Sequence, residues 1–216
     1  MRFFAHGSAF MNLMDRLTDM VLVNALFVLL CLPVFTYGAA KTALYEVAFQ
    51  WDLGERAGAG DYLRRFRNDL KTGVLPGLFM LLLAFMLGMN IRICTRNSAP
   101  VWMLAATLVV TVLFLAYREQ MFLIGARFLC GMRERLFNGI VMTIGILFLA
   151  VLIGIISAVP LLLAGISLVP FLNLIPVWLL IYYASSARLS VLLMREPCRK
   201  LMERLNREEN ADRKED

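Results

Sequence analysis

The chain has 216 residues, of which 60% are hydrophobic and 18% are charged, and its formal net charge is +6. Soluble domains are typically about 45–50% apolar and about 25% charged. The apolar residues are concentrated in long charge-free windows, and the lysines and arginines flank those windows. This distribution predicts an integral membrane protein. We expect the basic residues to face anionic lipid headgroups, and we expect no nucleic-acid partner.

The residues that usually build catalytic and metal sites are scarce. His6 is the single histidine, and the four cysteines are far apart in the chain. We find no Ser-His-Asp set, no H-E-x-x-H motif and no pair of aspartates inside an apolar stretch. We therefore expect no cofactor, no metal site and no enzymatic activity.

The first long apolar stretch, residues 20–40, is predicted to be the first membrane span. The 21 residues between Asp19 and Lys41 carry no charge, and ~20 helical residues cross the ~30 Å hydrocarbon core. The acidic flank before it argues against a cleaved signal peptide, so we expect the stretch to be retained. Its polar residue Asn24 is interpreted as an interhelical hydrogen-bonding group, and a substrate contact is the alternative.

The end of this stretch is predicted to shape the cytoplasmic mouth of the first span. Pro33 and Gly38 are expected to bend or end the helix there, together with Thr36. If Gly38 has a positive φ, a β-branched residue at this position should lower the folded yield.

The segment after the first span is predicted to be cytoplasmic. Residues 41–52 continue with apolar residues at helical spacing, and glycines then interrupt the pattern. Residues 61–71 place Tyr62, Phe66 and Leu70 on one face and basic residues on the others. This is the pattern of a short basic amphipathic helix on the membrane surface, and a partner-docking helix has the same pattern.

Further charge-free windows predict four more spans, at about residues 73–91, 98–117, 138–163 and 170–187. Arg118, Glu119 and Arg127 follow the third span and are expected to reach the membrane interface. Either Arg118 or Glu119 becomes a functional candidate if it lies inside the bundle. A re-entrant hairpin near 160–170 is an alternative to a simple turn. We expect one membrane-embedded domain over residues 1–195 and a charged, disordered cytoplasmic tail over 196–216.

The fold class is therefore predicted to be all-α: a polytopic transmembrane helical bundle of about five spans with short amphipathic cytoplasmic helices. Five spans place 18 of the 22 lysines and arginines on one side and 4 on the other. The positive-inside rule then predicts an outside N terminus and a cytoplasmic C terminus in a bacterial cytoplasmic membrane.

The stretch LCLPVFTYGAAKTALYEV, residues 30–47, resembles the signature of the YesL-like family of bacterial membrane proteins. Phe35 and Tyr37 depart mildly from the small aliphatic residues usual there. The resemblance extends to the residues before this stretch, to a second block at 66–71 and to a weaker one at 126–128. These matches supply the candidate structural or interaction residues: Asn24, Pro33, Thr36, Gly38, Tyr45, Phe66, Arg67, Asn68 and Arg127.

That family has no assigned activity, and its members are often encoded beside oligosaccharide ABC uptake systems. The resemblance therefore implies an accessory or interaction component of carbohydrate uptake, with ABC permease subunits as partners. An autonomous small transporter or channel is the alternative. It is disfavoured at this stage because we identify no acidic residue inside a predicted span. The sequence does not predict an oligomeric state.

Overall fold

The computed structural model describes residues 9–96, 100–128, 131–166 and 172–215, and the elements within them are helices. They confirm the predicted all-α fold class. In chain order the elements are α1 (Ala9–Leu30), the 3-10 turn η1 (Val34–Thr36), α2 (Tyr37–Asp52), α3 (Ala59–Arg96), α4 (Val101–Arg127), α5 (Met132–Gly145), α6 (Leu147–Ile166), α8 (Ile175–Val177), the π-helical turn η2 (Trp178–Tyr182) and α9 (Tyr183–Glu215).

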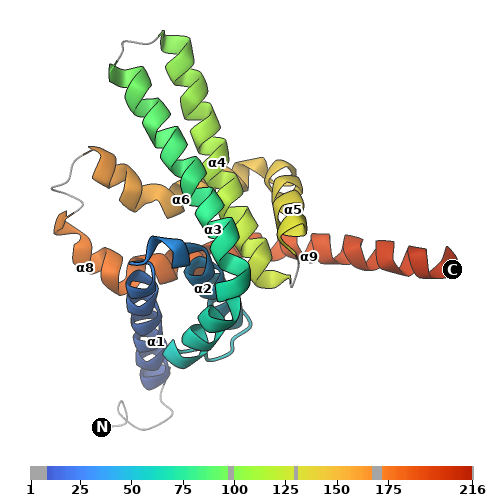
Figure 1. Ribbon diagram of the computed structural model, residues 1–216. Helices are drawn as coiled ribbons and strands as arrows, with labels where there is room; N and C mark the ends of the chain where they lie inside the picture. Colours follow the sequence, from blue (N-terminus) through green and yellow to red (C-terminus); the bar gives the residue numbers. More distant parts are fainter. Residues whose placement is uncertain (1–8, 97–99, 129–130, 167–171, 216) are drawn as a thin grey trace.

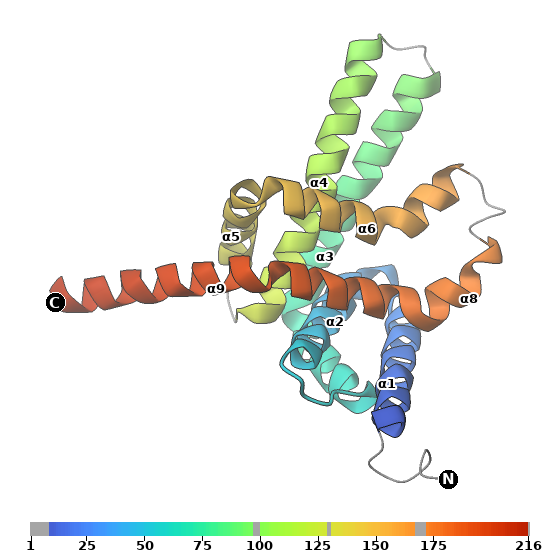
Figure 2. The ribbon, with the colours of Figure 1, turned by 180° about the vertical axis from the view of Figure 1, so that it is seen from behind.

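The helices are arranged around a small body from which two arms project. Helices α3 and α4 lie side by side as a long hairpin that extends beyond the rest of the molecule (Figure 1). Helix α6 and the α8–α9 segment form a second arm, and the C-terminal part of α9 projects on the opposite side of the body (Figure 2). Helix α9 continues through residues 196–215, so the expected disordered tail is helical in the structure.

Three helical segments are long and apolar enough to cross a membrane: α3, α4 and residues 175–200. A fourth candidate is the pair α5 and α6, which is bent by 110° at a short break. The chain therefore has the helices of a multi-pass membrane protein. Two expected spans, 73–91 and 98–117, fall on α3 and α4, although residues 97–99 lie outside the described residues.

The other predicted spans are not single regular helices. The expected span over 138–163 is divided between α5 and α6 by the 110° bend, with the break at Ile146. The expected span over 170–187 begins outside the described residues and then comprises α8, the π-helical turn and the start of α9. Charge-free length alone did not reveal either irregularity.

Residues 20–40, predicted to form a single span, are not one continuous helix. Helix α1 ends at Leu30, and the chain reverses through Pro33 and the 3-10 turn before α2 begins. The Thr36 hydroxyl lies 2.5 Å from the Leu30 carbonyl oxygen and 2.6 Å from that of Pro33, and it donates to one of them. The uncharged part of α1 runs over only 11 residues from Met20, about 16 Å of helix and half of the hydrocarbon core.

Helices α1 and α2 instead form a hairpin whose two ends meet. Arg56, in the loop after α2, pairs with Asp15 at 3.3 Å and with Asp19 at 3.1 Å, both on α1. The N-terminal part of α1 and the loop between α2 and α3 therefore lie at the same end of the hairpin. This differs from the expected five spans, in which the first span separated these segments.

Helix α2 lies at the centre of the body. Its side chains from Gly38 to Phe49 are almost all buried, and Ala39, Ala43 and Leu44 are fully so. The predicted surface helix over 61–71 is likewise not separate, because it is the first part of the continuous helix α3. The apolar face predicted there is confirmed for Tyr62 and Phe66, which are buried.

Glycines bring α2 and α3 into backbone contact. A Cβ added at Gly38 would lie 2.1 Å from the Gly73 carbonyl oxygen and 2.6 Å from the Gly77 Cα. Gly73 and Gly77 are spaced by four residues on α3, so both face α2 in a G-x-x-x-G pattern typical of closely packed membrane helices. The helices could not approach this closely with larger residues at these positions.

We predict that Gly38→Val abolishes or strongly reduces the folded yield. The cause is the α3 backbone rather than a positive φ, since Gly38 lies in a helix and Gly54 is the described glycine with positive φ. Overpacking typically costs about 1–3 kcal/mol, and backbone offers less room to yield than a side chain. The measurement is the monodisperse yield and thermal unfolding of the detergent-purified protein.

Gly88→Val is the matched control, because it lies on α3 and nothing is within 4 Å of a Cβ added there. Equal yields and equal unfolding temperatures for the two variants would contradict the close α2–α3 crossing.

Candidate functional site

A cluster of buried charged residues lies between α2, α4 and α6. Glu119 on α4 is fully buried, and Lys41 on α2 and Arg118 on α4 keep only 2% and 6% of their surface exposed. Tyr45 on α2 and Ser157 on α6 complete the group. We call these five residues the ionic cluster.

The Glu119 carboxylate is the centre of the ionic cluster. Its Oε2 lies 3.1 Å from the Lys41 ammonium and accepts a hydrogen bond of 2.5 Å from the Tyr45 hydroxyl. Its Oε1 accepts hydrogen bonds of 2.6 Å from Arg118 Nη2 and 2.7 Å from the Ser157 hydroxyl. Lys41 also donates to the Ser157 oxygen at 3.2 Å. Three helices are thus connected through one carboxylate.

These contacts offset the free-energy cost of burying the charged groups. An isolated ion loses its hydration at a cost of several kcal/mol, which only close opposite charges and hydrogen bonds offset. Glu119 has two cations and two hydroxyl donors, so both of its oxygens are satisfied. Arg118 and Glu119 both lie inside the protein, which is the arrangement that makes them functional candidates.

A pocket of about 260 Å³ opens beside the ionic cluster. Lys41, Arg118 and Ser157 form its polar side. The remaining walls are mainly apolar or aromatic and come from α1, the turn after it, α2, α6 and α9, including Phe27, Val28, Leu32, Tyr37, Pro160 and Tyr183. The ionic cluster is therefore buried but adjoins a space that a small ligand could enter.

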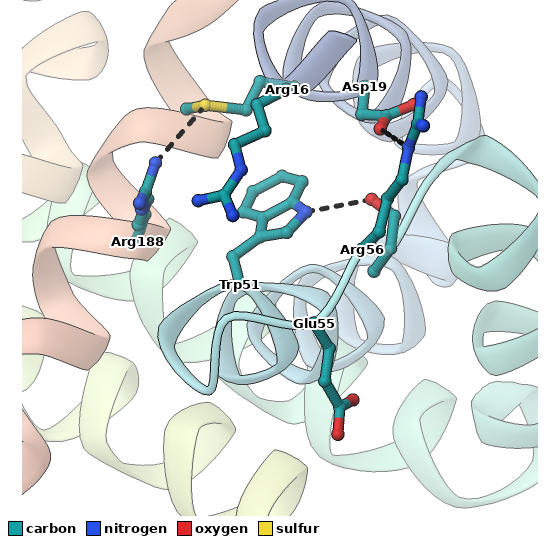
Figure 3. Close-up of a pocket in the computed structure, with 8 residues that line it drawn as sticks. Arg16, Asp19, Trp51, Glu55, Arg56 and Arg188 are labelled. Carbon is teal, nitrogen blue, oxygen red and sulfur yellow. Dashed lines mark hydrogen bonds and ion pairs between the residues drawn. The ribbon is translucent and has the colours of Figure 1, made fainter. Parts of the chain in front are cut away.

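A second cavity, lined largely by polar residues, lies between α1, the end of α2 and the first part of α9 (Figure 3). Arg56 pairs with Asp19, and the Trp51 indole donates a hydrogen bond of 2.9 Å to the Ala57 carbonyl. Arg188 from α9 approaches the same cavity, whereas the Glu55 side chain points away from its centre. Its volume of about 20 Å³ is room for about one water. These contacts join α1 to the end of α2 and to the loop that follows it.

Asn24 connects α1 to the irregular region before α9. Its amide nitrogen donates a hydrogen bond of 2.8 Å to the Trp178 carbonyl oxygen. Its side-chain oxygen accepts a hydrogen bond of 2.8 Å from the Ala184 N–H. These two backbone groups flank the π-helical turn, where the regular hydrogen-bond ladder is interrupted. The geometry agrees with the interpretation of Asn24 as an interhelical hydrogen-bonding residue.

The other sequence-predicted residues do not form one site. Tyr45 belongs to the ionic cluster, whereas Arg67 and Asn68 are exposed on α3. Arg127, at the end of α4, lies 5.2 Å from the centroid of the Phe49 ring, away from the ionic cluster. The remaining predicted residues lie in the turn after α1, at the α2–α3 crossing or in the core: Pro33, Thr36, Gly38 and Phe66.

Sequence reasoning missed Lys41, Glu119 and Ser157 as members of a common site. A signal was present for two of them. Lys41 is the only charge between Asp19 and Glu46, and Arg118 and Glu119 are the only charges in residues 97–126. Isolated charges of opposite sign in apolar surroundings are expected to pair. Ser157 gave no comparable signal, since hydroxyls also satisfy their own helix backbone.

Comparison with known proteins gives a family without an assigned activity. Residues 20–91 match a family described as "Protein of unknown function, DUF624". Neither the curated proteins nor the solved structures contain a match to this chain. The matched region comprises the end of α1, α2 and most of α3. It therefore contains the α2–α3 crossing and Lys41, but not Glu119.

No described group of three or more His, Cys, Asp or Glu side chains is placed to hold a metal ion. The chemistry that the ionic cluster can offer is charge and hydrogen bonding. Its excess of cations over carboxylates suits it to hold an anion rather than a metal.

We predict that Glu119→Gln destabilises the protein by about 3–5 kcal/mol, because it leaves Lys41 and Arg118 buried without the carboxylate that both contact. Thermal or denaturant unfolding in detergent measures the effect.

Glu196→Gln is the control, since Glu196 pairs with Arg199 on the surface of α9 with 62% of its side chain exposed. Such exposed pairs contribute about 0–1 kcal/mol. A Glu119→Gln variant as stable as Glu196→Gln would show that the buried ion pairs do not form.

Proposed function

We propose that the protein is an integral component of the bacterial cytoplasmic membrane that acts as an accessory or interaction subunit in carbohydrate uptake. The resemblance to the YesL-like family supplies the link to oligosaccharide ABC systems. The family match over residues 20–91 is consistent with a membrane protein of unassigned activity and adds no substrate.

The observation that carries the interaction role is the projecting α3–α4 hairpin. Large apolar side chains remain exposed along both helices, such as Phe85 at 66%, Trp102 at 72% and Val109 at 60%. Apolar faces of this extent lie against lipid or against other membrane helices. A hairpin that extends beyond its own body offers two helix faces to a neighbouring membrane subunit (Figure 1).

We propose that the basic end of the molecule faces the cytoplasm. Exposed Arg64 and Arg67 lie at the base of α3 and Arg127 at the base of α4, whereas Arg92 and Arg96 lie at the far end of the hairpin. The positive-inside rule favours the more basic end as cytoplasmic. Because the α1–α2 hairpin returns to this end, the N terminus is proposed to be cytoplasmic too, which replaces the outside location expected from the sequence.

We predict that a photo-crosslinking amino acid at Phe85 captures ABC permease subunits in the native membrane. The reason is that this exposed position on the projecting hairpin would lie in the subunit contact. The measurement is irradiation of cells, purification under denaturing conditions and mass spectrometry of the adducts.

The same amino acid at Met80 is the control, because Met80 is on α3 but only 1% exposed. Adducts at Phe85 that contain only lipid, or only a second copy of this chain, would contradict the accessory role.

An autonomous carrier is the second candidate, and Glu119 is the observation that favours it. Coupled carriers commonly use an intramembrane carboxylate, and Glu119 is a carboxylate buried inside the helical body. Four groups hold Glu119 in place, however, which suits a fixed structural charge better than one that is released during transport.

Flux measurements in proteoliposomes separate the two candidates. The accessory role predicts no uptake of maltose or sodium above that of protein-free liposomes. Reproducible uptake that is lost in a folded variant with the pocket beside the ionic cluster filled would favour the carrier instead.

A further inference from the structure

The pocket beside the ionic cluster has a charge imbalance that the protein itself does not neutralise. Lys41 and Arg118 both line this pocket of about 260 Å³. Within the described residues, both cations have Glu119 as their ion-pair partner. Two cations thus share one carboxylate, and the site carries a net positive charge in surroundings of low polarity.

Uncompensated positive charge in an apolar interior is costly unless an anion approaches it. Arg118 donates hydrogen bonds through Nε and Nη2, and both go to Glu119 Oε1. A guanidinium has five N–H donors, so Arg118, which lines the pocket, retains donor capacity beyond its bonds to Glu119. An anionic group beside Arg118 and Lys41 would use this capacity and offset the imbalance.

The walls and the mouth of the pocket indicate where such an anion comes from. Phe27, Val28 and Pro160 contribute apolar wall. Leu32 lines the pocket and is itself 76% exposed, and it belongs to the α1–α2 turn, which also exposes Val34 at 63%. An apolar turn of this kind favours contact with lipid over contact with water. The mouth is therefore suited to a ligand that arrives from the bilayer.

We propose that this pocket binds the anionic group of a membrane amphiphile, a carboxylate or phosphate attached to a hydrocarbon chain. The anion lies beside Arg118 and Lys41, and the chain leaves past Leu32 into the bilayer. The volume of about 260 Å³ is many times the ~10–15 Å³ that one water requires, which leaves room for a headgroup and the first part of a chain. This inference does not depend on the accessory role.

The test uses the full chain in nanodiscs of zwitterionic phosphatidylcholine, with spin-labelled stearate as the probe. Electron paramagnetic resonance reports the fraction of probe that the protein immobilises. We expect saturable immobilisation of the acid and at least about tenfold weaker immobilisation of its methyl ester, which lacks the charge. Equal binding of the two would overturn recognition of the anion.

Inorganic phosphate separates a lipid from a small water-soluble anion as the ligand. If the ligand is an amphiphile, millimolar phosphate leaves the immobilised fraction of stearate unchanged. Displacement of stearate by phosphate at such concentrations would assign the site to a free anion and overturn the lipid source.

Variants locate the binding to this pocket. Arg118→Gln should weaken stearate binding at least about tenfold, but it also removes a partner of Glu119 and puts folding at risk. Val28→Trp fills the pocket without changing any charge. Leu29→Trp, at the next position and 60% exposed, does not line the pocket and is the matched control.

We expect Val28→Trp to lose the saturable immobilisation and Leu29→Trp to retain it, with both proteins eluting as folded species. Unchanged binding in a folded Val28→Trp protein would place the stearate elsewhere and overturn the proposal.

Discussion

The buried carboxylate of Glu119 is the constraint on which the arrangement of the body depends. A charge with no exposed surface must have its partners in place, and those partners come from three different helices. Lys41 and Tyr45 bring α2 to α4, and Ser157 brings α6 to the same point. A packing that separated these helices would leave Glu119 or Lys41 charged and unpaired in apolar surroundings. The ionic cluster therefore favours the arrangement in which α2, α4 and α6 meet.

Close packing of α2 against α3 supports the same arrangement. Gly38 contacts the α3 backbone at Gly73 and Gly77, while Lys41, one turn later, contacts Glu119 on α4. Helices α6 and α4 also cross closely, because Gly154 on α6 has no side chain where it approaches the backbone of Ala116 on α4. Helix α2 is thus held by a close glycine crossing with α3 and by an ion pair with α4. The long arms extend from this body.

The sequence predicted the features that depend on composition and length. The all-α class and the apolar helices over 73–91 and 98–117 follow from charge-free windows that α3 and α4 match. It did not predict that residues 20–40 reverse direction. A Pro-containing run of 21 uncharged residues has the length of a span whether or not the chain turns at Pro33. The reversal is seen in contacts of the fold: the Thr36 hydroxyl at the turn, and the Arg56 pairing with Asp15 and Asp19.

The ionic cluster was missed for a related reason. Lys41 and Arg118 were interpreted as flanking charges because they follow apolar windows, and the positive-inside count then used them as loop residues. Their partner Glu119 is 78 positions from Lys41, so no local pattern connects the two. Long-range ion pairs are a property of the fold, and the sequence carried only the weaker signal of isolated charges with opposite sign.

The most direct test of this account is a double-mutant cycle between Lys41 and Glu119, measured by unfolding of Lys41→Met, Glu119→Gln and the combined variant. The buried pair predicts strong coupling: the double variant should be more stable than the sum of the single effects by at least about 1 kcal/mol. Additive effects, with no coupling beyond about 0.3–0.5 kcal/mol, would show that the two side chains do not meet, and would contradict the central role of the ionic cluster.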